Sequence, residues 1–426
     1  MRGDFSTRTA DAVERASRTS NIRGVLHQQG KVLRDVDLTD SDLLAVGWQD
    51  AIAAAVIGND VAAVPVDAPN GFRIEAARVT GPAATPRIEV TVHGGALWAD
   101  GLPASIGTDP AGTVVRTATY FGPPVQSPAA SPSSIGAGIR DAVVLETSYE
   151  ELNAFQDPER LLEPALGGPD TAERIHTRSA LRLYRLGPDE TCCTIRSTLN
   201  AGDTGRGRLT ASLLPVTVVG GECPTVATGG YTGFEHSLYR IEIAEVNPGF
   251  APRFKYSWCN GGLVGRGTFR PAAMNPSGKD SVAIDANLAA IKGCGLTDFY
   301  LEALQFDTAL GYWRTSYGVD ATLDPSGQEL ELAATPVLGT SLPPAATPTF
   351  FRLWNGIRTM ASFTTLTELA DGITLQFDPP GSATYRPRDY WTFSVRAGEI
   401  ANPATLIAAE LPHGIEYHRV ALAEIQ

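Results

Sequence analysis

The chain has 426 residues, with 43% hydrophobic and 19% charged side chains and a formal net charge of −13. A single hydrophobic core stops growing at about 250 to 300 residues, so this length predicts two to four folded domains. The acidic balance argues against nucleic acid as a partner and against binding to an anionic membrane surface, because both would repel the chain.

The first 28 residues contain five arginines, two aspartates and one glutamate but no apolar core. They therefore lack the pattern of a secretory signal, and no 18-residue apolar run occurs further along the chain. We expect no membrane insertion, and we expect synthesis and assembly in the cytoplasm.

Apolar residues recur at three- and four-residue spacing between Ser41 and Ile57, which predicts a helix. The cluster Asp40-Ser41-Asp42 could cap the first amides of this helix, and Gly58 follows as a plausible stop. Residues 24–33 read as a short extended segment. Residues 1–64 are therefore predicted to form an N-terminal arm and one helix, which together make a docking element.

The rest of the chain is predicted to be mainly β, with several β-sandwich or barrel-like units. The 43 glycines and 30 prolines lie between short runs of Val, Ile, Thr, Tyr and Phe. Apolar and polar residues alternate at 72–75 and 88–92, as in strands with one wet face. Further strands are expected at 142–147, 180–185, 209–219, 237–243, 254–258, 299–306, 350–363, 373–377, 390–395 and 417–423.

Segments rich in proline divide this β region. Residues 122–140 and residues 333–348 cannot pack a core of their own, so each is predicted to be a linker or a surface loop. The resulting domains are a small β domain at 65–121, a central β domain at 141–332 and a C-terminal β domain at 349–426.

Four aspartates, Asp35, Asp37, Asp40 and Asp42, suggest a cation site but do not fit a calcium loop. The sixth position of such a loop requires glycine and the twelfth requires glutamate, and this chain has Asp40 and Val46 there. Capping and a favourable interaction with the helix dipole explain the aspartates better. We expect no metal.

The glycine-rich segment Gly261–Gly267 superficially resembles a phosphate-binding loop. Such a loop opens a helix, whereas Thr268-Phe269-Arg270-Pro271 follows here and is not helical. The segment is therefore predicted to be a turn between two strands.

The cysteines and histidines do not form a recognisable site. Cys192, Cys193, Cys223, Cys259 and Cys294 are interpreted as reduced and mostly buried thiols, because five is an odd number and too few for a disulfide scaffold in a chain of this length. The adjacent pair Cys192 and Cys193 lacks the two-residue gap that lets both thiolates reach one zinc ion. His413 and His418, with Glu416 between them, could bind a metal or form an acid–base pair. No nucleophile signature lies nearby, so we expect no enzymatic activity and no cofactor.

Aromatic residues offer an alternative function. Tyr312, Trp313, Tyr317 and Trp354 could line a sugar-binding face, although strand core or a domain interface is the simpler interpretation. Tyr312 and Trp313 are the candidate glycan contacts. No spacing of carboxylates singles out the two that a glycan hydrolase needs.

Several segments, taken in order, resemble one domain family found in gene clusters of extracellular contractile injection systems and of phage-tail-like particles. The matching segments are Met1–Ser6, Gly24–Val32, Asp35–Asp37, Asp157–Glu159, Glu163–Ala172, Gly233–Ile243, Phe254–Trp258, Arg388–Trp391, Val395–Ala397 and Gly414–His418. The block Glu163–Ala172 is the most specific match. The chain departs from the family at Leu38, where an aromatic residue is typical, and at 321–348, which has no counterpart.

The resemblance implies a structural subunit of the baseplate, tail fibre or surrounding cage, without catalytic residues. Its partners would be other particle subunits, namely baseplate, spike or fibre proteins, and further copies of itself in a homo-oligomer. The particle would be assembled in the cell and released from it. In the arm, the expected assembly contacts are Phe5, Leu26, His27, Gln28 and Gln29. The alternative is a tail-fibre protein that binds a receptor or a glycan on the target cell.

Overall fold

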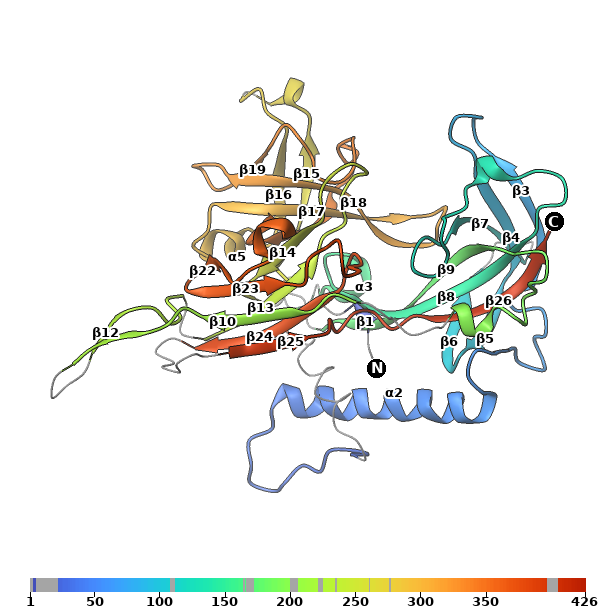
Figure 1. Cartoon of the computed structure of the whole chain (residues 1–426), viewed down its shortest axis with the longest axis horizontal. Coiled ribbons are helices and arrows are strands. Elements are labelled where there is room, and N and C mark those ends of the chain that lie inside the picture. Colours follow the sequence, from blue (N-terminus) through green and yellow to red (C-terminus); the bar gives the residue numbers. More distant parts are fainter. Residues whose placement is uncertain are drawn as a thin grey trace.

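The computed structural model of the chain describes residues 3–4, 22–107, 112–163, 165, 172–199, 206–220, 225–233, 236–259, 261–275, 277–396 and 405–426. Strands dominate these residues and form several sheets, one of which closes into a barrel. The mainly β fold class expected from the sequence is confirmed. Figure 1 shows three β units and a long helix that lies outside them.

The first unit is a seven-stranded sheet, called here the N-terminal sheet. Its strand order is β1–β8–β9–β7–β4–β3, and β26 also pairs with β8. The strands are β1 (Gly3–Asp4), β3 (Ile74–Thr80), β4 (Arg87–His93), β7 (Thr113–Tyr120), β8 (Asp141–Leu152), β9 (Arg174–Arg185) and β26 (His418–Ile425). The alternation expected at 88–92 is present, because Ile88, Val90 and Val92 of β4 are buried. A small sheet of β2 (Ala62–Ala63), β5 (Gly95–Ala99) and β6 (Leu102–Ile106) packs on the same core.

The second unit is a closed barrel with the strand order β15–β16–β19–β18–β17–β20. The strands are β15 (Leu263–Arg270), β16 (Ser281–Ala286), β17 (Asp298–Asp307), β18 (Tyr312–Leu323), β19 (Glu329–Leu332) and β20 (Thr349–Trp354). The short helices η3 (Ala272–Met274) and α5 (Leu288–Gly293) lie between its strands in the chain. Side chains such as Phe269, Leu301, Val319 and Phe351 fill the interior.

The third unit is a β-sandwich of two four-stranded sheets that share one core. One sheet has the order β21–β14–β13–β24, and the other has the order β22–β23–β10–β25. The strands are β10 (Leu209–Leu213), β13 (His236–Ile243), β14 (Arg253–Ser257), β21 (Gly356–Thr359), β22 (Thr367–Ala370), β23 (Ile373–Phe377), β24 (Tyr390–Arg396) and β25 (Thr405–Glu410). A ribbon of β11 (Thr217–Val219) and β12 (Thr225–Thr228) extends from this unit (Figure 1).

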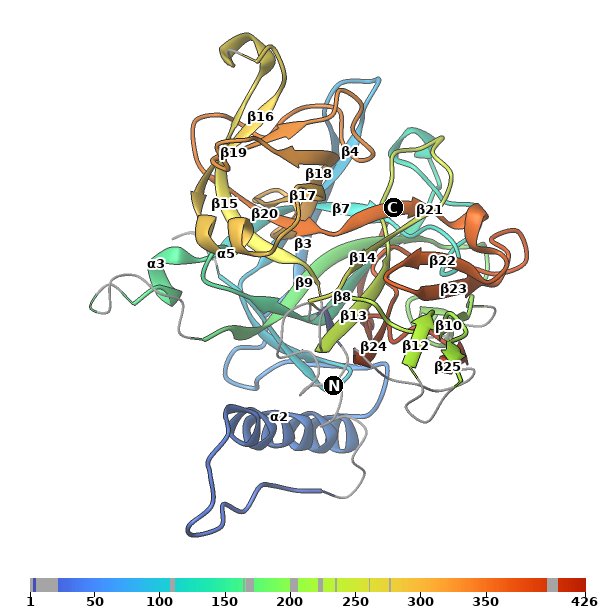
Figure 2. The same ribbon diagram turned by 90° about the vertical axis from the view of Figure 1, so that its left-hand side faces the viewer.

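Strand pairing joins segments that lie on both sides of the domain boundaries expected at 121–141 and 333–349. β7 pairs with β9 across the first boundary. β26, from the C-terminal end of the chain, pairs with β8 near residue 141, with Ile425 opposite Asp141. The three units are therefore interleaved in the sequence, and Figure 2 shows them from a second side.

The hairpin of β17 and β18 connects the barrel to the N-terminal sheet. At its tip, the backbone N–H of Thr117 on β7 donates to the carbonyl of Ala309 at 2.7 Å. The guanidinium of Arg178 on β9 lies 3.8 Å from the centre of the Tyr312 ring. The hairpin therefore ties two of the three units together.

Five buried charged side chains, called here the buried ion cluster, lie where the sandwich meets the barrel. They are Arg240, Glu242, Lys255, Glu302 and Arg352. Lys255 Nζ lies 3.0 Å from Glu242 and 2.6 Å from Glu302, which connects β14 of the sandwich to β17 of the barrel. Burial by itself would raise the pKa of Glu242, but the cations Lys255, Arg240 and Arg352 hold it below the ordinary value.

The glycine-rich segment Gly261–Gly267 was expected to be a turn between two strands. Gly265 and Gly267 instead lie inside strand β15, so the prediction of a turn is wrong for these residues. A Cβ atom on Gly265 would lie 2.8 Å from the Phe351 ring, and one on Gly267 would lie 2.6 Å from the carbonyl oxygen of Ala283. Glycine is needed here because strands and a core phenylalanine approach the backbone closely.

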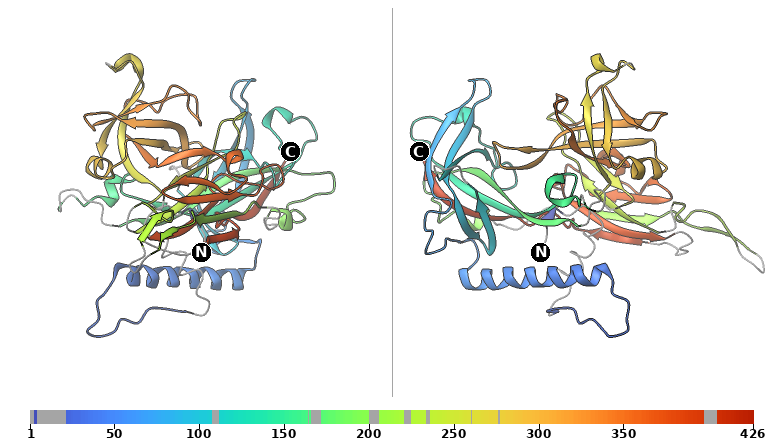
Figure 3. Two further views of the ribbon diagram at one scale, coloured as in Figure 1. Left: turned by 60° about the vertical axis from the view of Figure 1, so that its left-hand side comes forward. Right: turned by 180° about the vertical axis from the view of Figure 1, so that it is seen from behind.

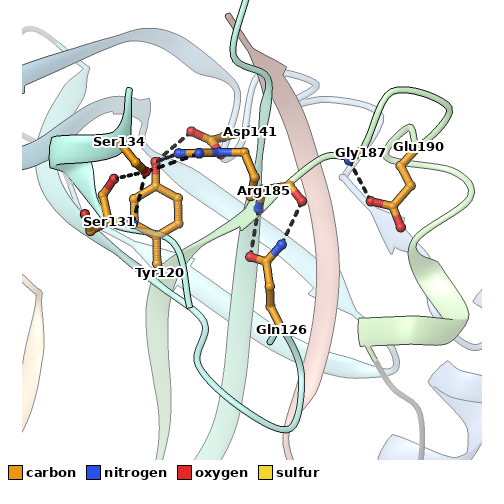
Figure 4. Close-up of polar contacts among 8 residues, drawn as sticks. All are labelled: Tyr120, Gln126, Ser131, Ser134, Asp141, Arg185, Gly187 and Glu190. Carbon is orange, nitrogen blue, oxygen red and sulfur yellow. Dashed lines mark hydrogen bonds and ion pairs between the residues drawn. The ribbon is translucent and has the colours of Figure 1, made fainter. Parts of the chain in front are cut away.

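The proline-rich segment 122–140 runs over the surface and contains the short helix η1 (Pro132–Ser134). Figure 4 shows how it is bound to β9. The Gln126 side chain donates to the Arg185 carbonyl at 2.7 Å and accepts from the Arg185 N–H at 2.9 Å. The Arg185 guanidinium in turn donates to Asp141 at 2.6 Å and to Ser134 at 3.2 Å. Side-chain hydrogen bonds thus fasten this segment although it adds little to a core.

Candidate functional site

The long helix α2 extends from Asp35 to Ile57. It begins six residues before the expected start, so Asp40-Ser41-Asp42 lies inside the helix and the prediction that this cluster caps it is wrong. Arg34 occupies the cap position, and carboxylates in the first turn, including Asp37, interact favourably with the helix dipole. The expected stop is present, because the Gly58 N–H donates to the Ala54 carbonyl at 2.9 Å.

One face of α2 is attached to the β units. Leu43 and Leu44 on this face are buried. The Tyr149 hydroxyl on β8 donates to the Asp50 carboxylate, with both oxygens at 2.8 Å. Gly101 has a φ of +87°, and a Cβ atom there would lie 2.9 Å from the Ala54 Cβ. This close approach at the turn between β5 and β6 therefore requires glycine.

The opposite face of α2 points away from the β units and is rich in apolar side chains. The exposed fractions are 49% for Leu38, 61% for Ile52 and 78% for Val56. Ile52 and Val56 belong to the apolar pattern that predicted the helix, yet both side chains are exposed. The helix has apolar residues on both faces, so periodicity alone could not identify the packed one.

Six exposed positions of α2 follow alternating steps of four and three residues, which is the spacing of a coiled-coil seam. They are Leu38, Asp42, Ala45, Gln49, Ile52 and Val56, called here the outer stripe, and Asp35, Ala51 and Ala55 are exposed beside it. Helix α2 also carries five aspartates and no lysine or arginine. The outer stripe therefore suits a partner that offers apolar side chains together with positive charge.

The segment before α2, residues 22–34, lies beside the helix and adds exposed apolar side chains. The Trp48 indole N–H donates to the carbonyl of Ile22 at 3.2 Å, and the Arg23 guanidinium lies 4.6 Å from the centre of the Trp48 ring. Leu26 is 93% exposed and Val32 is 87% exposed. These exposed apolar side chains make the segment, together with α2, a candidate contact region. Figure 3 shows the segment and α2 together on one side of the molecule.

Of the expected assembly contacts, Leu26, His27, Gln28 and Gln29 are exposed in the segment before α2. Residues 24–33 contain no strand, and a turn is present in which the Lys31 N–H donates to the Gln28 carbonyl at 3.3 Å. Phe5 lies outside the described residues. The expected contacts that are described thus lie on the same side of the molecule as α2 (Figure 3). Sequence reasoning missed the outer stripe of that helix.

The aromatic candidates for glycan binding lie mainly in packed positions. Tyr312 is buried under Arg178, and Tyr317 and Trp354 belong to the core. Trp313 is half-buried and lies edge-on to Phe306, with the ring centres 5.9 Å apart. Phe306 is 48% exposed, so the surface aromatic pair is Trp313 with Phe306 and not Trp313 with Tyr312.

The histidines near the C-terminus point to different partners. His418 Nδ1 lies 2.8 Å from an Asp100 oxygen, whereas the His413 ring centre lies 5.5 Å from that of Tyr390. Within the described part of the chain, no group of three or more His, Cys, Asp or Glu side chains is arranged to hold a metal ion.

Four of the five cysteines lie among the described residues, namely Cys192, Cys193, Cys259 and Cys294, while Cys223 lies outside them. Only Cys294 among these four is buried, so the expectation of mostly buried thiols is wrong for the other three. Cys192 and Cys193 lie in a surface turn before the short helix α4 (Arg196–Leu199), where no core covers them fully.

Comparison with known proteins gave no match to a protein-family model, to a curated protein or to a solved structure. The resemblance to the injection-system family therefore rests on the sequence segments quoted above. Among the described helices, none has the length and apolar character needed to cross a membrane.

The attachment of α2 is expected to depend on pH through Asp50. Burial raises the pKa of Asp50 above its ordinary value, although the hydrogen bond from Tyr149 acts in the opposite direction. A raised pKa in the attached state means that attachment is strongest when Asp50 is protonated and weakens as the pH rises through that pKa. Hydrogen exchange of the α2 amides, corrected for intrinsic rates, should show protection that falls with rising pH. In Asp50→Asn the same protection should vary less with pH, and an unchanged profile would contradict this role.

Proposed function

We propose that this chain is a non-enzymatic structural subunit of a phage-tail-like contractile injection particle. Its place would be the baseplate or a cage-like or fibre-like extension around it. The observation that carries the proposal is the surface formed by the outer stripe and the exposed segment before α2. The choice of particle is supported by the family-like segments, which extend from Met1 to His418.

In this proposal, α2 packs against a helix of a neighbouring subunit. The outer stripe has the spacing for such packing, with Leu38, Ile52 and Val56 as the larger apolar side chains. Polar residues at Asp42 and Gln49 interrupt the apolar side chains, and a polar residue in a helix seam sets register at some cost in stability. The aspartates of α2 favour a neighbour that carries lysine or arginine beside its apolar stripe.

The β units would supply the rigid body of the subunit. The β17–β18 hairpin connects the barrel to the N-terminal sheet, and the buried ion cluster connects the barrel to the sandwich. Because these contacts fix the units to one another, the subunit would move as one body when a neighbouring subunit pulls on it. This role requires no catalytic site and no cofactor.

The proposal is tested by incorporation of the subunit into particles. The double substitution Ile52→Glu with Val56→Glu places two charges on the outer stripe without removing a buried contact. We expect the variant to fold normally but to be lost from purified particles, because the charges would be desolvated in the helix contact. Quantitative mass spectrometry of particles, with circular dichroism of the free subunit, measures both effects.

A matched control is Val79→Glu on β3, an exposed apolar side chain (52% exposed) away from α2. This variant should enter particles as the unmodified chain does. Normal incorporation of the Ile52→Glu, Val56→Glu variant would show that the outer stripe is not the docking surface. Absence of the unmodified chain from all particles made with its neighbouring genes would overturn the proposed function as a whole.

A further inference from the structure

The N-terminal sheet curves into a half-barrel that is open between β3 and β26. Among the described residues, β3 pairs only with β4 and β26 pairs only with β8, so each strand presents one unpaired edge to the opening. A cavity of about 350 Å³ lies there and is lined by residues of both strands. Unpaired strand edges are the places where a further strand can add to a sheet. This cavity is called here the strand groove.

The core of the half-barrel is incompletely covered at the strand groove. Val79 on β3 stands opposite Ile88 on β4, so both side chains lie on the inner face of the sheet. Ile88 is 2% exposed, whereas Val79 is 52% exposed. Ile74, Ala77 and Ile425 also line the groove, and they pack on the core while remaining partly exposed. An added strand with apolar side chains would remove this surface from water.

The charged side chains that line the strand groove already have partners within the chain. The ion pairs are Glu75 with Arg73, Arg78 with Glu89, Asp141 with Arg185 and Glu424 with Arg140. The lining side chains therefore offer no unmatched charge to an occupant. A charged side chain placed in the groove would lose water without gaining a partner, so the groove suits a strand with uncharged side chains.

The ribbon of β11 and β12 has this chemistry. All three residues of β11 and all four residues of β12 are Val, Thr or Ala, and Glu222 is the one charged residue in the sequence from 214 to 230. The two strands form a sheet of their own among the described residues, and such a ribbon is only marginally stable in water. Its base is fixed to the sandwich, because the Leu214 N–H donates to the Gly372 carbonyl at 2.8 Å. The ribbon would therefore gain stability from a further strand.

The ribbon and the strand groove lie at opposite ends of the molecule. In Figure 1 the ribbon projects at one end of the long axis, and β3 and β26 lie at the other end; Figure 3 shows the same arrangement from behind. The ribbon therefore cannot reach the groove of its own chain. We propose that the ribbon of one copy adds to the β3 edge in the strand groove of a second copy. Because the two surfaces differ, the contact is head to tail and builds rings or filaments.

The test is sedimentation velocity of the full chain over a range of concentrations. We expect the unmodified chain to form dimers and larger species as the concentration rises. Val79→Glu places a charge in the groove, and Val218→Lys with Val226→Lys places two charges at facing positions of the ribbon. Each variant should weaken self-association at least about tenfold, because the new charges would be desolvated in the contact. Circular dichroism establishes that each variant is folded.

An equal mixture of the groove variant and the ribbon variant isolates the contact. One intact ribbon and one intact groove remain in each pair, so the mixture should form dimers with one copy of each variant and nothing larger. Met274→Glu is the matched control, because Met274 is 67% exposed on η3 of the barrel, and it should associate as the unmodified chain does. If Val79→Glu does not fold, Ala76→Lys at an exposed position of β3 provides the same test.

Any of three results would overturn the proposal. They are an unmodified chain that stays monomeric at every concentration, a variant of groove or ribbon that associates as the unmodified chain does, and a mixture that forms no dimers. Dimers of the ribbon variant alone would show that two grooves pair with each other instead. The proposed particle function does not depend on this contact: entry into particles depends on the outer stripe, so Val79→Glu should still enter them.

Discussion

Replacing Lys255 with methionine is expected to lower the free energy of unfolding by about 3 to 5 kcal/mol, the usual cost of breaking a buried ion pair by removing one partner. Lys255 Nζ lies between Glu242 and Glu302, at 3.0 Å and 2.6 Å. Methionine fills a similar volume but leaves the two buried carboxylates facing each other without the cation between them. Equilibrium unfolding in urea measures the loss.

The matched control for this prediction is Lys279→Met. Lys279 Nζ lies 2.7 Å from Glu331, a similar distance, but the Lys279 side chain is 60% exposed. Exposed ion pairs contribute about 0 to 1 kcal/mol, so the control should unfold nearly as the unmodified chain does. Equal losses in the two variants would show that burial of Lys255 does not decide its contribution.

Gly267→Ala is expected to destabilise the barrel by about 1 to 3 kcal/mol, the range for overpacking a close-packed core. The new Cβ would lie 2.5 Å from Val282 Cγ1 and 2.6 Å from the backbone oxygen of Ala283. The oxygen belongs to the paired strand β16, so relief requires the two strands to move apart. Thermal unfolding should show a lower melting temperature.

Gly293→Ala is the control for the barrel glycine. Gly293 ends helix α5, and a Cβ atom there would meet nothing within 4 Å. Alanine in a helix is favoured over glycine by about 0.5 to 1 kcal/mol, so this variant should be unchanged or slightly more stable. A stable Gly267→Ala variant would mean that the barrel strands adjust at little cost.

Local patterns located many of the strands well. The expected strand at 373–377 is β23 (Ile373–Phe377), and the one at 390–395 is β24 (Tyr390–Arg396). Hydrophobic alternation and flanking turn residues act over a few positions, so one sequence is enough to detect them. The start of α2 was placed too late, because acidic residues suited to a first helical turn occur at both Asp35 and Asp40.

The candidate sites were less accessible to sequence reasoning. The exposed segment at Leu26 was identified, but the outer stripe at Ile52 and Val56 was not, because which side of a helix is covered depends on distant residues such as Tyr149. Contacts between residues far apart in the chain left no local signal. Arg182 and Arg419 are 237 positions apart in the sequence, and they meet only because β26 pairs with β8.

Composition and alternation by themselves determined that this chain is folded, acidic and mainly β, because these properties sum over short stretches of sequence. Strand β13 marks the limit of that reasoning. Apolar and polar residues alternate along it, as in a strand with one face in water, yet Arg240 and Glu242 are buried against the barrel. Only the tertiary structure decided which faces meet, which strands pair and which buried charges form ion pairs, since those depend on contacts between residues far apart in the chain.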